Sequence, residues 1–133
     1  MTFVLDTSVT MAWCFEDEAR TETDQLLRSL GDEPATVPAL WQWEVVSVLL
    51  VAQRKGRMSE AQADRFLALL AQLPIEVETI ATLTGVLSMG RRHVLSAYDA
   101  AYLELASRAG LGLATLDTRL ADAAREVGVA LRL

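Results

Sequence analysis

The sequence predicts a three-layer α/β/α fold in which a central, mostly parallel sheet of four to five strands is covered by helices on both faces. Short apolar runs alternate along the chain with longer segments of helical periodicity, which is the order expected of β-α-β units. Polar residues follow several of these runs directly, so parallel strands would bring them to one edge of the sheet. No low-complexity linker divides the 133 residues, and we expect a single domain over residues 1–133.

The first half of the chain is predicted to alternate between short strands and helices. In order, these are a strand at 3–5, helices at 7–15 and 21–30, a strand at 35–37, a helix at 39–55 and a helix that begins at Ser59. Thr7 or Ser8 could cap the first helix, and Gly31 and Gly56 would end the next two. The helix from Ser59 should bury its leucines, namely Leu67, Leu69, Leu70 and Leu73.

The second half continues the alternation. In order, we expect a strand at 75–78, a helical stretch at 79–92, a helix at 97–108, a strand at 112–116, a helix at 118–127 and a last edge strand at 129–131. Gly110 should stop the helix at 97–108, and Gly128 should turn the chain before the edge strand.

The composition indicates a compact soluble protein. Hydrophobic residues make up 52% of the chain and charged residues 23%. Cys14 is the only cysteine, which excludes an intramolecular disulfide and a Cys-based zinc site, and we expect a small buried hydrophobe there. No secretory signal precedes the first strand, and the longest apolar stretch, 45–52, is too short to span a bilayer. These features favour a cytoplasmic protein without membrane contact.

Four acidic residues are candidates for one site. Asp6 follows the first predicted strand directly, and Asp117 follows the strand before the last helix. Open α/β sheets bind ligands outside the carboxyl ends of their strands, so both carboxylates should face a crevice. Glu44 and Asp99 lie in helices that start near the same edge. Converging carboxylates suit a hard divalent cation, with magnesium or manganese favoured over zinc.

Helix capping is an alternative explanation for three of these acids. Asp6 and Asp117 could be the N-caps of their helices, and Ser96 with Asp99 has the Ser-x-x-acid form of a capping box. Capping does not explain Glu44, which we expect on an apolar stripe where an ionised side chain costs free energy unless something compensates it. The other members of that stripe are Leu40, Val48 and Val51.

Several motifs spread over nearly the whole chain carry a resemblance to a known family. They are Val-Leu-Asp-Thr-Ser at residues 4–8, Glu44 in the helix after Pro38, Leu-Ser-Ala-Tyr-Asp-Ala-Ala-Tyr-Leu at 95–103, and Leu-Ala-Thr-Leu-Asp at 113–117. The Tyr-Asp-Ala and Ala-Thr-x-Asp blocks are specific, whereas Asp-Thr-Ser alone is weak. With these motifs the chain resembles the PIN-domain ribonucleases, and most closely the VapC-type toxins of bacterial toxin–antitoxin pairs.

The resemblance implies a magnesium- or manganese-dependent endoribonuclease that hydrolyses RNA phosphodiester bonds with a four-carboxylate site. By this resemblance Asp6 and Asp99 are the principal metal ligands, while Glu44 and Asp117 complete the ligand shell or orient the attacking water. The resemblance also implies a homodimer and a cognate antitoxin that covers the acidic site.

Three further polar residues match supporting positions of the family pattern. Ser8 and Thr115 correspond to residues that support the acids by hydrogen bonds. Ser47 occupies a position where the family often has asparagine, which puts one polar contact in doubt.

The charge distribution bears on an RNA partner. A net charge of -6 is unlike the cationic face that phosphate contacts usually need. Carboxylates that hold a cation would account for part of this acidity, and Arg92 and Arg119 are then candidates for RNA phosphate contacts. Because clustered acids repel one another, we expect at least one raised carboxylate pKa in the metal-free protein.

The remaining polar and aromatic residues are predicted to be structural. His93, beside two arginines, should be a surface histidine, and Trp13, Trp41 and Trp43 should lie in the core or at an interface. Tyr98 and Tyr102, four residues apart on one helix, are predicted to pack with their hydroxyls at the rim.

Two other functions remain open at this stage. An aspartyl phosphatase or a receiver domain would need a second aspartate two residues after Asp6, or a lysine on a late strand, and the sole lysine is Lys55. A catalytically silent PIN-like binding module should lack one or more of the four acids, and all four are present.

Overall fold

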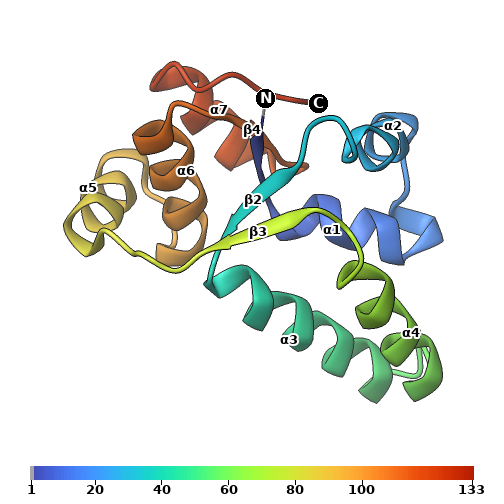
Figure 1. The fold of residues 1–133 in the computed structure, drawn as a ribbon. Helices are drawn as coiled ribbons and strands as arrows, with labels where there is room; N and C mark the ends of the chain where they lie inside the picture. The colour runs from blue at the N-terminus through green and yellow to red at the C-terminus, as the bar shows by residue number, and fades with distance from the viewer. Residues whose placement is uncertain (1) are drawn as a thin grey trace.

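A parallel four-stranded sheet forms the centre of the computed structural model, which describes residues 2–133 (Figure 1). The strands are β1 (Phe3–Leu5), β2 (Ala35–Pro38), β3 (Ile75–Glu78) and β4 (Gly112–Ala114). Their order is β3-β2-β1-β4, and each neighbouring pair is parallel. In the register of the sheet, Val4 lies opposite Thr36 on one side and Leu113 on the other.

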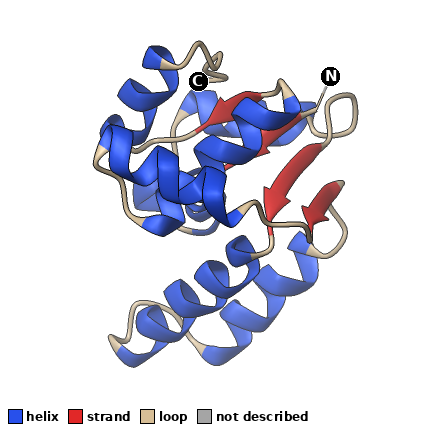
Figure 2. Ribbon diagram, turned by 90° about the vertical axis from the view of Figure 1, so that its left-hand side faces the viewer, coloured by secondary structure: helices blue, strands red, loops and turns tan. Residues whose placement is uncertain are grey.

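Helices cover both faces of this sheet. They are α1 (Thr7–Cys14), α2 (Thr21–Ser29), α3 (Leu40–Arg54), α4 (Glu60–Leu70), α5 (Leu83–His93), α6 (Ala97–Ala109) and α7 (Thr118–Glu126), with a short 3-10 helix at Glu16–Glu18. Right-handed crossovers with this strand order place α1 to α4 on one face and α5 and α6 on the other. Figure 1 shows this arrangement, with α7 beside α6, and Figure 2 shows α3 and α4 extending past the sheet. The predicted three-layer class is confirmed.

The apolar runs form the core because the inner strands are covered on both faces. Phe3, Val4 and Leu5 of β1 are completely buried, as expected for a central parallel strand. Helix α6 contributes a buried face that includes Tyr102 and Leu103. The longest helix among residues 2–133 has 15 residues, and none of the described helices is long and apolar enough to cross a membrane.

Two predicted elements differ from the structure. The edge strand at 129–131 is reduced to a single bridge between Leu131 and Leu113, because this segment exchanges backbone hydrogen bonds with β4 only at Leu113, through Ala130 and Arg132. The stretch 79–82 has no regular secondary structure, and α5 begins only at Leu83. Threonine and isoleucine make up three of those four residues, and such β-branched residues disfavour the helical conformation.

The predicted burial of two helices is wrong in part. Helix α4 buries Leu70, but Leu67 and Leu69 are 40% and 55% exposed. Helix α3 does not bury the predicted stripe of Leu40, Val48 and Val51. Its buried residues are each one position further along the chain, namely Trp41, Val45, Leu49 and Ala52. Glu44 therefore lies at the flank of the buried face rather than at its centre.

The tryptophans differ in their surroundings. Trp41 is buried and its Nε1 donates to Thr10 Oγ1 at 2.9 Å, and Trp13 packs against the core with Nε1 donating to the Thr23 carbonyl. Trp43 is largely exposed on α3. Cys14 is half-buried against the core, and burial raises the pKa of its thiol, as expected for an unreactive cysteine.

His93 is not the surface histidine that the neighbouring arginines predict. Its side chain is only 6% exposed, and Nδ1 lies 2.9 Å from a carboxylate oxygen of Glu126 on α7. Its Nε2 is buried and has no hydrogen-bond partner within residues 2–133. His93 thus ties the end of α5 to α7.

Val94, which ends α5, has a backbone conformation that is costly for valine. Its φ of 53° and ψ of 52° are left-handed, and its side chain is 76% exposed. A β-branched residue in this region is strained. We expect Val94→Gly to stabilise the protein by about 1 kcal/mol, because the relief of strain exceeds the entropy that glycine adds to the unfolded chain. Urea unfolding of Val94→Gly and Val94→Ala tests this, and a glycine variant less stable than wild type would show that Val94 is not strained.

Candidate active site

Asp6 lies at the carboxyl end of β1 in an almost completely buried position. The residue is 6% exposed, and its backbone N–H donates to the Ala114 carbonyl at 3.0 Å, which continues the pairing with β4. Two hydroxyls, those of Ser8 and Thr115, donate to the same oxygen, Oδ2, both at 2.7 Å. No side chain of residues 2–133 donates to Oδ1, so one oxygen of this buried carboxylate is left for another ligand.

The two hydroxyls also connect Asp6 to the segment after β4. Thr115 Oγ1 accepts from the backbone N–H of Asp117 at 3.0 Å, and Ser8 Oγ accepts from that of Leu116 at 2.9 Å. Each hydroxyl therefore bridges a carboxylate and a backbone amide. These bonds hold the chain that leads to Asp117 beside Asp6.

Capping explains part of the role of the acids. Asp6 occupies the N-cap position of α1 but makes no capping bond, so neither Thr7 nor Ser8 caps that helix. Asp117 does cap α7, with Oδ1 accepting from the Leu120 N–H at 3.1 Å. Ser96 caps α6 by accepting from the Asp99 N–H at 3.1 Å. This capping bond involves the backbone of Asp99 and not its carboxylate. Of the three acids that capping could have explained, Asp6 is thus the one that takes no part in a capping bond.

Glu44 is half-buried and is held by a buried hydroxyl pair. The Tyr102 hydroxyl donates to Glu44 Oε1 at 2.6 Å, and Thr7 Oγ1 donates to the same oxygen at 2.9 Å. The two hydroxyls also lie 2.7 Å apart. These contacts from α1 and α6 compensate an acidic side chain at the flank of the buried face of α3.

Tyr102 is a positioning residue that the sequence interpretation missed. It is completely buried, and its hydroxyl lies in the acidic site rather than at the rim. Burial and then the hydrogen bond to Glu44 raise its pKa far above the ordinary value, so the hydroxyl stays protonated and donates. Tyr98, four residues earlier, is largely exposed. Nothing in the sequence distinguishes the two tyrosines. Only the burial of Tyr102 in the structure shows that its side chain faces the core.

Burial is the largest cause of the altered acidity of the site. It raises the pKa of Asp6 to about 6, while the Thr115 and Ser8 hydroxyls lower it, and the charges of Asp99 and Glu44 add smaller increases. The pKa of Asp99 is also raised, first by burial and then by the charges of Asp117 and Glu44. The predicted raised carboxylate pKa is confirmed, but mutual repulsion is its secondary cause.

These charge effects link Asp6 with Asp99 and Glu44, and Asp99 with Asp117 and Glu44. As positioned, however, no three Asp, Glu, His or Cys side chains of residues 2–133 lie close enough together to hold a metal ion. Rotation of short carboxylate side chains is needed to bring them to one ion. The donor set itself fits a hard cation, because it consists only of oxygens and includes a buried carboxylate with one unbonded oxygen.

The other residues predicted for the site, Arg119, Arg92 and Ser47, differ in their contacts. Arg119 is exposed, and its charge lowers the pKa of Asp99, so it lies near the site. Arg92 is exposed and makes no side-chain hydrogen bond or ion pair with the described residues. Ser47 is exposed on α3, three residues after Glu44, and makes no side-chain hydrogen bond with the described residues.

Fold and site together define an α/β protein with an acidic candidate active site at the carboxyl edge of a parallel sheet. The chain belongs to the PIN domain family, whose sequence profile matches residues 3–126. The four acids all lie within that matched region.

Named relatives agree with this assignment. Over 86 residues the chain is 41% identical to Ribonuclease VapC3 of Mycobacterium tuberculosis H37Rv. This alignment covers 65% of the chain and 62% of the length of that relative. It is 31% identical over 125 residues to Ribonuclease VapC3 of Pyrobaculum aerophilum, with 92% of this chain and 94% of that protein covered. The fold is also similar to a chain of VapBC2 from Rickettsia felis bound to a promoter DNA fragment, with a TM-score of 0.71, 10% identity, and 98% and 97% of the two chains covered.

Replacing Tyr102 by phenylalanine should reduce activity with little loss of stability. The change removes one of two donors to Glu44 without opening a cavity, and one such hydrogen bond contributes about 1 to 2 kcal/mol, which corresponds to a rate reduced roughly tenfold. Initial rates of the metal-dependent RNA cleavage that we propose below, together with thermal unfolding, test this. Tyr98→Phe, which alters an exposed hydroxyl on the same helix, is the matched control and should cleave like wild type. Equal rates for the two variants would show that Tyr102 only packs.

Proposed function

We propose that this protein is a metal-dependent endoribonuclease and the toxin of a toxin–antitoxin pair. One observation carries the proposal: the buried Asp6 carboxylate, held by two hydroxyls, shares one edge of the sheet with three other acids that affect its charge or that of Asp99. The names of the two relatives support RNA as the substrate. A single catalytic domain over residues 1–133 is part of the proposal.

Asp6 and Asp99 would hold a magnesium or manganese ion, with Glu44 and Asp117 completing its surroundings. When bound, the cation supplies positive charge to the phosphodiester oxygens and makes an attacking water more acidic. The chain's own residues prepare the site. Ser8 and Thr115 fix Asp6 through Oδ2, and Tyr102 with Thr7 fixes Glu44, so two carboxylates are oriented before substrate arrives.

The alternative functions have less support. A silent binding module gives no reason to keep an acid as deeply buried as Asp6, whose burial opposes its ionisation. A receiver domain or aspartyl phosphatase needs a second aspartate two residues after Asp6 or a lysine on a late strand, but residue 8 is serine and the sole lysine, Lys55, follows α3.

Two protein partners belong to the proposal. An antitoxin is supported by the likeness to a VapBC2 chain. A homodimer is supported by exposed apolar side chains at helical spacing on α3, namely Trp43, Val46 and Leu50. We place the protein in the cytoplasm, where its RNA substrate and a free thiol at Cys14 are both expected.

The proposal is tested by incubating the purified protein with single-stranded RNA and with duplex RNA. We expect cleavage with magnesium or manganese and none after complete removal of the metal by a chelator. Restoration of cleavage by added metal would exclude irreversible damage. Cleavage that persists in the chelated protein, or that is equal in an Asp6→Asn preparation, would overturn the mechanism.

A further inference from the structure

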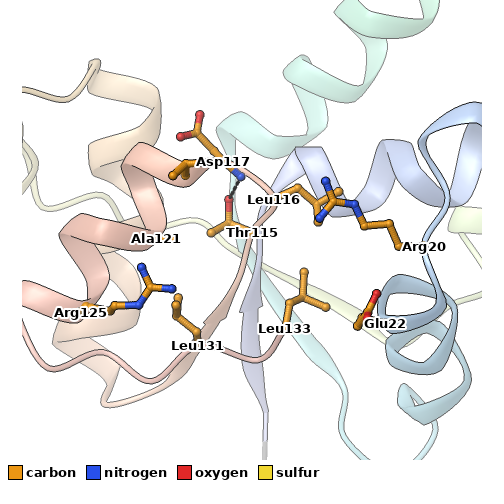
Figure 3. Close-up of a pocket in the computed structure, with 10 residues that line it drawn as sticks. Arg20, Glu22, Thr115, Leu116, Asp117, Ala121, Arg125, Leu131 and Leu133 are labelled. Carbon is orange, nitrogen blue, oxygen red and sulfur yellow. Dashed lines mark hydrogen bonds between the residues drawn. The ribbon is translucent and has the colours of Figure 1, made fainter.

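A hollow of about 330 Å³ lies next to the acidic site, between α2, the segment that joins β4 to α7, and residues 131–133 (Figure 3). Thr115 and Asp117 belong both to its wall and to the acidic site. The Asp117 carboxylate points away from the two arginines of the hollow in Figure 3. The hollow is therefore a neighbour of the acids rather than part of their cluster, and its size is at the lower end of that of small-molecule sites.

Two guanidinium groups line the hollow from opposite sides. Figure 3 shows Arg20, just before α2, across from Arg125 on α7. The Arg20 guanidinium makes no hydrogen bond or ion pair with a side chain of residues 2–133, although the chain has a net charge of -6. Such an uncompensated cation can bind an incoming anion without first breaking a contact. Guanidinium groups match the geometry of phosphate oxygens.

The second arginine is paired, but weakly. Arg125 lies 2.8 Å from Asp122, and both side chains are largely exposed, a setting in which an ion pair contributes about 1 kcal/mol or less. A phosphate can displace Asp122 at small cost. Glu22 is the other acid of the hollow apart from Asp117, and it lies on the same side as Arg20.

Apart from Thr118, the rest of the lining is apolar, which narrows the class of ligand. The apolar residues are Leu116, Ala121, Leu131 and Leu133. A free phosphate ion has no use for such a surface, whereas a nucleobase packs on apolar side chains and on guanidinium planes. Apolar and cationic groups in one hollow thus match the two parts of a nucleotide.

We propose that this hollow binds one nucleotide of single-stranded RNA beside the nucleotide at which the acids act, with Arg20 and Arg125 contacting phosphate and the apolar residues contacting the base. The choice of RNA rests on the proposed function. A base within a duplex is paired and stacked, so only an unpaired nucleotide can enter.

Binding can be measured apart from cleavage in the Asp6→Asn background, with a short fluorescent oligoribonucleotide and anisotropy as the readout. We expect Arg20→Ala, Arg125→Ala and Ala121→Phe, which fills the hollow, each to weaken binding roughly tenfold. Each arginine change should also lower the dependence of log affinity on log salt by about one. Arg28→Ala, an exposed arginine at the other end of α2, is the matched control and should bind like its parent.

The outcomes separate this proposal from the proposed function. If wild type cleaves RNA with metal while the three hollow variants bind and cleave like their parents, the subsite is wrong and the function stands. If the arginine variants bind weakly but Ala121→Phe binds normally, the arginines contact RNA phosphates at the surface and no nucleotide enters the hollow. That result would overturn the nucleotide site. If wild type never cleaves RNA, the function fails, and the binding comparison still decides on the hollow. The arginines are exposed, so thermal unfolding of their variants should match that of the parent.

Discussion

Asp6→Asn should reduce metal-dependent RNA cleavage by roughly a thousandfold or more, and it should also stabilise the metal-free protein at neutral pH. The loss of activity is expected because the variant lacks the buried carboxylate that we assign to the cation. The gain in stability is expected because burial raises the pKa of Asp6 to about 6, so the folded protein at pH 7.5 pays for a desolvated charge. An amide of the same shape avoids that cost, although the Ser8 and Thr115 hydroxyls must then donate to a weaker acceptor.

Cleavage assays and urea unfolding in chelator, both at pH 7.5, test these two effects together. Asp64→Asn, an exposed acid on α4, is the matched control and should change neither property. An Asp6→Asn variant that cleaves RNA at the wild-type rate would remove Asp6 from the active site. A variant that is inactive and also strongly destabilised would show that Asp6 is mainly structural.

The stability of the metal-free protein should fall as pH rises from about 4 to above 6. The folded-state pKa of Asp6, about 6, exceeds its ordinary value of 3.8. Between these two values the folded protein binds more protons than the unfolded chain, so raising the pH favours unfolding. The contribution of Asp6 is fully unfavourable above about pH 6, where it amounts to about 3 kcal/mol. The raised pKa of Asp99 acts in the same direction.

Subtracting the free energy of unfolding of Asp6→Asn from that of wild type separates the contribution of Asp6 from those of other titrating groups. Free energies of unfolding measured in chelator across this range should give a wild-type deficit that grows with pH and then levels off. Saturating magnesium should remove the deficit above pH 6, because a bound cation stabilises the charged carboxylate. A difference that does not change with pH would show that the Asp6 pKa is the same in the folded and unfolded chains.

The order of strands and helices was predictable because each element carries a strong local signal. The run at 3–5 is apolar throughout, as a strand buried on both faces must be, and Ser59 and Gly110 mark helix ends by capping chemistry. Predictions that depended on tertiary contacts were less accurate. The segment 129–131 pairs with β4 only at Leu113, and Leu67 and Leu69 show that an apolar residue on a helix need not face the core.

Part of the candidate site was likewise visible in the sequence. Asp6 and Asp117 could be placed at the carboxyl edge from strand order alone. The contacts that hold the side chains of the site could not be predicted from the sequence, because they join residues far apart in the chain. Tyr102 and Thr7, for example, meet at Glu44 only after α1, α3 and α6 have packed. Burial is also the main cause of the raised pKa of Asp6, and burial cannot be read from the charged residues of the sequence.

We propose that acids from four segments of the chain form one divalent-cation site. Calorimetric titration of manganese at pH 7.5 into wild type and into Asp6→Asn, Glu44→Gln, Asp99→Asn and Asp117→Asn tests it most directly, with Asp64→Asn as the control. We predict that wild type and the control bind manganese alike, and that each of the four variants binds it roughly tenfold or more weakly. Wild-type affinity retained in Asp6→Asn and Asp99→Asn would contradict the claim.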